Sequence, residues 1–214
     1  MKRKVFGVGL NKTGSKTLAA CLRQLGFNHL DYCERTVTDF LAGDMASVWA
    51  AADRHDSSDD WPWPLLYREL AERYRDARFV LTVRKSADIW LSSLVKHAHR
   101  LELYDRIDEA IYGYRYPENA PAHYKAIYER HNHEAMQFLG ERCRPLCWED
   151  GDSWPELCSF LEEELPQVPL PFENRAWQPP VDHRIATALQ CKLEQAKLAR
   201  RARMGREMPK GLLA

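Results

Sequence analysis

The sequence predicts an α/β fold: a central parallel sheet of about four to five strands, flanked by helices on both faces. Short apolar runs that read as strands alternate with segments whose apolar residues recur at helical spacing. A glycine-rich turn, GLNKTGSKT at residues 9–17, joins the first apolar run to the first helical segment. Strands that alternate with helices are typical of parallel sheets, and the carboxyl ends of such strands are where ligands bind.

The elements follow in order along the chain. Strands are predicted at residues 4–10, 27–32, 78–83 and 144–148. Helices are predicted at residues 15–25, 36–52, 65–74, 87–97, 122–139 and 153–165. Between them, DRHDSSDDWPWP at 53–64 is too charged for an element interior, so we expect a loop there.

The chain of 214 residues is long enough for one substantial domain. We expect a single α/β domain of the P-loop type over residues 1–180, which ends in the proline-rich segment 166–180. The remaining segment, 181–214, reads as a basic C-terminal helix packed on the same domain.

Composition excludes several function classes. Lys plus Arg and Asp plus Glu both number 31, so no global basic field favours nucleic acid, and any anion site is local. No run of apolar residues is long enough to span a membrane, and the N-terminus lacks a signal peptide. The six cysteines are scattered, which favours buried, reduced thiols in a cytoplasmic protein. Homo-oligomerisation stays open.

The loop after the first strand is a candidate anion site. Its amides and the helix N-terminus present donors, and Gly14 permits close backbone approach. The side chains that add hydroxyl donors or positive charge are Lys12, Thr13, Ser15, Lys16 and Thr17.

The register of this loop separates two kinds of phosphate ligand. A nucleoside-triphosphate P-loop has its lysine directly after the last glycine, where this chain has Ser15. Read from Lys12, NKTGSKTL resembles the 5′-phosphosulfate-binding loop of sulfotransferases, P-K-[ST]-G-[ST]-T. Asn11 replaces the usual proline and Lys16 the second threonine.

A second segment resembles the 3′-phosphate-binding segment of the same family. In FVLTVRKSADIWLSSLVKH, at 79–97, Arg84 ends a strand and Ser92 lies eight residues further on. An arginine can bind a phosphate through two parallel hydrogen bonds. The alternative reading pairs Arg84 with Asp88 and leaves Ser92 on a helix face.

Residues 4 to about 177 resemble small members of the P-loop sulfotransferase superfamily. The resemblance implies an enzyme of the EC 2.8.2 type that uses 3′-phosphoadenosine-5′-phosphosulfate as donor and a small-molecule hydroxyl or amine as acceptor. It implies no metal. In-line transfer then needs a cation at the bridging oxygen, for which Lys12 is our choice.

The general base is the least conventional part of the pattern. Where cytosolic relatives carry a histidine before a proline, this chain has Asp60 in DDWP, which we favour as the base over an Asx turn before Trp61. His55 is a second candidate, and His131 either lines the acceptor pocket or is structural. Aromatic residues form either an acceptor cavity or core packing: Trp61, Trp63, Trp90, Tyr112, Tyr114 and Tyr116.

Two alternatives remain from the residues alone. A P-loop kinase or nucleotide hydrolase would use Lys16-Thr17, with Glu149-Asp150 as the magnesium-binding acid after a strand. A non-catalytic anion-binding protein would retain the loop without turnover.

Overall fold

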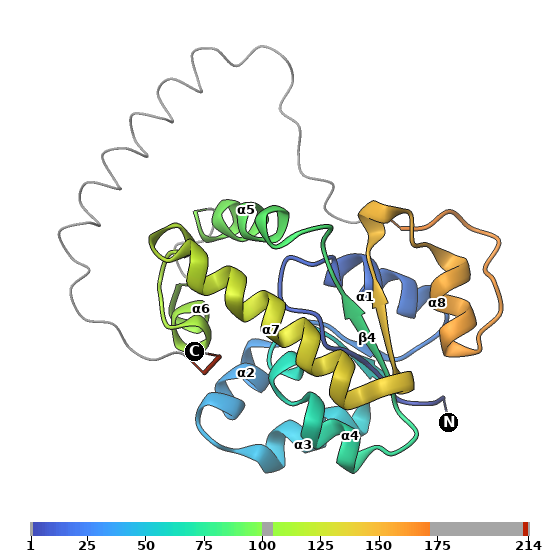
Figure 1. The fold of residues 1–214 in the computed structure, drawn as a ribbon. Helices are drawn as coiled ribbons and strands as arrows, with labels where there is room; N and C mark the ends of the chain where they lie inside the picture. Colours follow the sequence, from blue (N-terminus) through green and yellow to red (C-terminus); the bar gives the residue numbers. More distant parts are fainter. Residues whose placement is uncertain (1, 100–104, 172–211, 214) are drawn as a thin grey trace.

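The computed structural model describes residues 2–99, 105–171 and 212–213. Its core is a five-stranded parallel sheet in the order β2-β3-β1-β4-β5 (Figure 1). The strands are β1 (Val5–Gly7), β2 (His29–Leu30), β3 (Ser57–Ser58), β4 (Arg78–Thr82) and β5 (Cys143–Leu146). The predicted α/β class and parallel sheet are confirmed.

Strand β3 lies inside the segment that we expected to be a loop. Ser57 pairs with Val5 on one side and with His29 on the other, and both serines of the strand are 1% exposed. Its backbone groups are satisfied by β1 and β2, and small serine side chains fit between the layers. The polar sequence conceals the strand because its neighbours, rather than its own apolar content, hold it in the sheet.

Helices cover both faces of this sheet. They are α1 (Ser15–Gln24), α2 (Glu34–Leu41), α3 (Met45–Arg54), α4 (Tyr67–Arg73), α5 (Ala87–Ala98), α6 (Asp105–Tyr112), α7 (Pro121–Leu139) and α8 (Trp154–Leu161). The helix predicted at 36–52 is two helices, because Gly43 adopts a positive φ of 79° and Asp44 caps α3 by accepting from the Ser47 amide.

Two apolar clusters bind the helices to the sheet. On one face, Val5 and Val80 pack with α1 and α8; on the other, Phe6 and Phe79 pack with α3, α4 and α7 (Figure 1). Alternate residues of β1 therefore serve opposite layers, as the pleat of a strand requires.

A third cluster lies among β1's loop, α5, α6 and α7. It contains Trp61, Trp90, Tyr112 and Tyr124, each no more than 3% exposed, and the Trp61 and Tyr112 rings meet edge to face at 5.8 Å. These aromatic rings are core packing. Trp63 belongs to the core beneath α4 and α7.

Several sequence predictions concern other parts of the chain. The basic helix predicted at 181–214 and the thiol of Cys191 lie outside the described residues, Leu212 and Leu213 apart. The five described cysteines are free thiols: Cys21, Cys33, Cys143, Cys147 and Cys158. Among the described helices, none combines the length and the apolar character that a membrane span requires.

Candidate functional site

The candidate site lies at the carboxyl ends of the strands, where ligands of open α/β sheets bind. The loop at residues 10–14 follows β1, Asp59 and Asp60 follow β3, and Arg84 follows β4. Trp148 begins a short 3-10 helix, Trp148–Asp150, just after β5. The topology thus brings together residues far apart in sequence.

Two close contacts fix the base of the loop. A Cβ on Gly9 would lie 2.4 Å from the Thr82 carbonyl oxygen, so only glycine fits there. The Thr13 hydroxyl donates to the Leu10 carbonyl at 2.6 Å and lies 2.7 Å from the Thr82 hydroxyl. Thr13 is 1% exposed. Its hydroxyl, which we expected to face the anion, is occupied within the protein.

Gly14 is held by a contact that the sequence did not reveal. Its φ is 109°, and a Cβ there would lie 2.4 Å from Cδ1 of Trp148. The Trp148 indole N–H donates to the Gly14 carbonyl at 3.2 Å. The tryptophan therefore lies directly against the last glycine of the loop.

The amino end of α1 has amides available for an anion. Gly14 is its N-cap and makes no side-chain capping bond. The first amides of an α-helix have no acceptor within the helix, and α1 begins at Ser15. Lys16 and Thr17 supply the next two amides. The helix terminus is thus the kind of site that binds phosphate or sulfate oxygens.

Asn11, which stands where the family pattern has proline, ties the loop to α5 and α6. Its carbonyl accepts from the Trp90 indole at 2.9 Å, and its side-chain oxygen accepts from the Tyr112 hydroxyl at 2.6 Å. Its side-chain amide donates to Asp108 at 3.3 Å. A proline would lack the last two bonds, so the loop is anchored here by a polar side chain.

Arg84 reaches the loop. One guanidinium nitrogen, Nη1, donates to the Lys12 carbonyl at 3.4 Å, and Nη2 lies 2.7 Å from a Glu149 carboxylate oxygen. The buried Nε has no hydrogen-bond partner among the described residues. Asp88, the partner in our alternative reading, instead pairs with Lys125 at 3.0 Å.

The carboxylates that the kinase alternative needs are paired with cations. Glu149 pairs with Arg84, and Asp150 lies 2.9 Å from the Lys85 ammonium. The Lys85 amide also donates to Glu149 at 3.3 Å. Both acids that follow β5 are thus engaged by side-chain cations in the described part of the chain.

The two loop lysines differ: Lys12 is distinguished by its backbone conformation and Lys16 by an ion pair. Lys12 has a positive φ of 66°, which a tight loop imposes on a non-glycine residue only rarely. The Lys16 ammonium lies 3.5 Å from Asp31 and is about half exposed.

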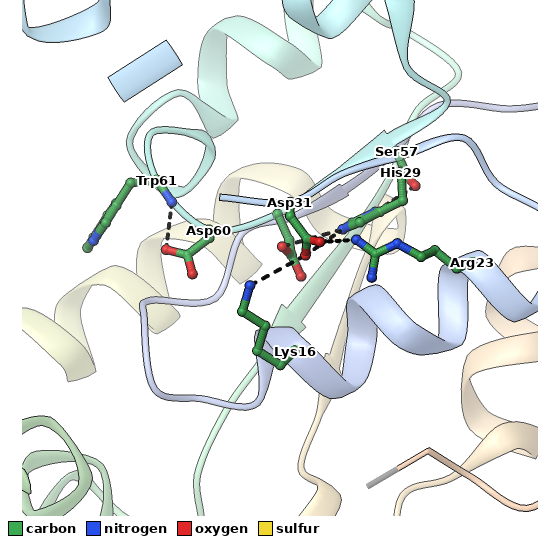
Figure 2. Close-up of polar contacts among 8 residues, drawn as sticks. Lys16, Arg23, His29, Asp31, Ser57, Asp60 and Trp61 are labelled. Atoms are coloured by element: carbon green, nitrogen blue, oxygen red, sulfur yellow. Dashed lines mark hydrogen bonds and ion pairs between the residues drawn. The ribbon is translucent and has the colours of Figure 1, made fainter. Parts of the chain in front are cut away.

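Asp60 follows β3 at the same carboxyl edge of the sheet. It is half-buried, has a φ of 65°, and its carboxylate accepts from the Trp61 amide at 2.8 Å (Figure 2). Burial raises the pKa of Asp60, while the Trp61 amide and the charges of Lys16 and Lys12 act in the opposite direction. The local contact with Trp61 is the one that the Asx-turn reading predicts.

The remaining candidates lie elsewhere. His55 ends α3 and donates to the Ala51 carbonyl at 2.8 Å, and its own carbonyl accepts from Lys4, at the amino end of β1. It is at the edge opposite the loop. His131 is buried in α7 and donates to the Val8 carbonyl at 2.7 Å, so it is structural, and burial lowers its pKa. Ser92 is exposed on α5, and its role stays a prediction.

The residues of this site lie within a segment that matches a known protein family. Residues 4–178 match the model of the sulfotransferase domain family, a span that includes the loop, Asp60, Arg84 and Glu149. None of the curated proteins compared with the chain matches it. The match extends over most of the 214 residues, and the chain belongs to the sulfotransferase domain family, whose chemistry is sulfuryl transfer.

Proposed function

We propose that the protein transfers a sulfuryl group from 3′-phosphoadenosine-5′-phosphosulfate to a hydroxyl or amine of a small-molecule acceptor. The observation that carries this proposal is the contact between Arg84 Nη1 and the Lys12 carbonyl at 3.4 Å. It joins the two anion-binding elements, the loop with the α1 N-terminus and the arginine after β4, at one edge of the sheet.

The residues present fit a ligand with two anionic groups. The uncapped α1 N-terminus suits the 5′-phosphosulfate, and the Arg84 guanidinium suits the 3′-phosphate. The unpartnered buried Nε of Arg84 supports this reading, since a phosphate can accept from it. When bound, the donor supplies a sulfuryl group attached to a phosphate leaving group.

The chain's own residues then supply charge and a proton acceptor. Lys12 neutralises charge at the bridging oxygen, and removal of one such preorganised donor typically costs about 3–4 kcal/mol of transition-state stabilisation. Asp60 accepts the acceptor's proton, because it follows β3 at the carboxyl edge that also holds the loop, and its described hydrogen bond comes from a backbone amide.

The direct test uses a ligand pair that needs no acceptor. We expect adenosine 3′,5′-bisphosphate to stabilise the full chain against heat, whereas magnesium-ATP does not. At one hundred times its dissociation constant a ligand adds about 2.7 kcal/mol to the free energy of unfolding, or roughly 5–11 °C for a chain of this size. Stabilisation by magnesium-ATP alone would falsify the proposal and favour the kinase alternative.

A further inference from the structure

A second group of ionisable side chains lies at the same edge of the sheet, at the ends of β2 and β3. His29 and Asp31 are two residues apart on the β2 segment, and Ser57 and Asp59 are two apart on the β3 segment. Since alternate residues of a strand share a face, all four project to one side of the sheet. Figure 2 shows that Lys16 and Arg23 of α1 approach from that side.

The donor atoms of three of these side chains converge. His29 Nε2 lies 3.5 Å from Asp59 Oδ1 and 3.9 Å from Asp31 Oδ1, and ligand atoms of the three residues all lie within 4.8 Å of one another. Zinc binds imidazole nitrogen and carboxylate oxygen at about 2.0–2.2 Å, so an ion between the three atoms needs only small side-chain shifts. We propose that His29, Asp31 and Asp59 form a binding site for a divalent metal ion of the zinc class.

Burial makes this more than a surface group of acids. The His29 side chain is 0% exposed and Asp59 is 2% exposed. Neither His29 Nε2 nor Asp59 Oδ2 has a hydrogen-bond partner among the described residues. Asp31 Oδ1, 3.9 Å from His29 Nε2, is a third such atom, and the nearest acceptor to Nε2 is Asp59 Oδ1 at the long distance of 3.5 Å. Buried polar atoms normally have a partner, so three in one group leave hydrogen-bonding capacity for a ligand. A cation can be that ligand.

The imidazole is oriented as metal-binding histidines are. Its Nδ1 lies 2.8 Å from the Ser57 hydroxyl, which is itself buried in β3. When Nδ1 donates to that oxygen, the lone pair of Nε2 faces the two carboxylates. Histidines that bind metals typically donate their other ring N–H to a neighbouring group, which fixes the tautomer.

The central strand leaves room for the site. A Cβ on Gly7 would lie 2.6 Å from the Asp59 Cβ and 3.0 Å from Leu18 of α1. Glycine at this point of β1 therefore allows Asp59 to lie between the sheet and α1. A side chain there would push the carboxylate away from His29.

Two positive side chains lie beside the proposed site. Arg23 pairs with Asp31, and the Lys16 ammonium lies 3.5 Å from Asp31 Oδ1. Both cations are nearly half exposed, so each can turn toward water when an ion enters. Their charge opposes any divalent cation equally, and the choice among ions comes from the ligands: the imidazole favours zinc over magnesium and calcium, which prefer oxygen ligands alone. Three protein ligands leave a fourth position open.

The experiment measures metal binding by the full chain after treatment with a chelator. Isothermal titration with zinc chloride, and visible absorption with cobalt(II) chloride as a probe of the ligand set, need neither donor nor acceptor. We expect His29→Gln and Asp59→Asn to lower zinc affinity by at least about tenfold. His133→Gln, at an exposed position of α7, is the matched control and should bind as the wild type does.

Removal of a buried group can prevent folding, so Asp31→Asn, at a position 37% exposed, provides an independent variant. Loss of the cobalt absorption bands in this variant supports the site. The proposal is overturned if the wild type takes up no zinc, or if Asp31→Asn and His29→Gln bind zinc as the wild type does. Because no nucleotide is present, either result leaves the bisphosphate test of the proposed function unaffected.

Discussion

The two halves of the sheet's carboxyl edge contrast in burial. Around β1, β4 and β5, cations and acids come from different elements, and the Arg84 and Glu149 side chains are 24% and 32% exposed. Around β2 and β3, the His29 and Asp59 side chains are almost fully buried. The partly exposed Arg84–Glu149 pair can open toward solvent. The buried His29 and Asp59 side chains have no such freedom.

This contrast shows why bulk composition says little about the site. Positive and negative residues balance at 31 each, and the carboxyl edge joins several of them in ion pairs, Arg84 with Glu149 on one half and Arg23 with Asp31 on the other. The Lys16–Asp31 pair, at 3.5 Å, spans the boundary between the halves. Asp60 lies on the β2–β3 half, and the charges of both loop lysines lower its pKa against the effect of burial.

The largest effect is expected at Asp60, where the β2–β3 half would take part in chemistry. Asp60→Asn should lower turnover by about 100- to 10,000-fold, the usual contribution of a general base. Binding of adenosine 3′,5′-bisphosphate should not change. The measurement is release of that product from the donor across a panel of phenols, alcohols and amines. Asp88→Asn, at an exposed acid paired with Lys125, is the control; equal turnover in both variants removes Asp60 from the mechanism.

Lys12→Ala tests the half around β1, β4 and β5 at the point of bond cleavage. Loss of one preorganised cation should reduce turnover by about 100- to 1,000-fold. The same product-release measurement applies, with the exposed Lys96→Ala of α5 as control. A variant that turns over normally would place the leaving-group charge elsewhere.

Arg84→Ala tests recognition rather than chemistry. Loss of charge-assisted hydrogen bonds should lower the affinity for adenosine 3′,5′-bisphosphate by about 10- to 100-fold, as measured by isothermal titration. The affinity for adenosine 5′-phosphate, which has no 3′-phosphate, should fall only slightly. Arg68→Ala, at an exposed arginine paired with Glu134, serves as control. Equal losses for the two nucleotides would contradict a 3′-phosphate role.

Glu149→Gln should have the opposite effect on the affinity for adenosine 3′,5′-bisphosphate. In the proposed complex the bound phosphate displaces this carboxylate from Arg84, so its neutralisation should strengthen bisphosphate binding by about 2- to 5-fold, the range for a solvent-accessible ion pair. Asp150→Asn, which alters the Lys85 pair instead, is the matched control. Weaker binding in Glu149→Gln would mean that the carboxylate positions Arg84 for the ligand.

The smallest effect is expected where the halves meet. Asp31→Asn releases Lys16 toward the α1 N-terminus, so bisphosphate should bind slightly more tightly, by less than about 3-fold. The titration is done with chelator present, so that any metal at His29 does not contribute. Weaker binding would show that Asp31 holds Lys16 in a useful place.

The sequence predicted the parts of the fold that local patterns encode. Apolar runs at β1, β4 and β5 and the helical periodicity of α1 and α7 appear as expected. Strand β3 did not, because two serines carry no apolar signal and are buried only by their neighbours. The break between α2 and α3 was readable, since Gly43-Asp44 is an ordinary helix stop followed by a cap.

The features of the candidate site also divide into those that local sequence predicts and those that depend on tertiary contacts. The loop and Arg84 follow recognisable strands, so their convergence could be predicted from topology alone. Trp148 against Gly14 and Glu149 against Arg84 depend on how β5 ends beside β4, which no local pattern records. The buried environment of His29 likewise required β3, the strand that the sequence concealed.

Asn11 has a consequence for anyone who redesigns this protein. Through it the donor loop and the aromatic cluster share one hydrogen-bond junction, with Trp90 on its carbonyl and Tyr112 on its side chain. A substitution that repacks the aromatic core at Trp90 or Tyr112 therefore also removes or shifts a bond that holds the loop. Core packing and loop geometry are coupled in this chain, and they must be selected together.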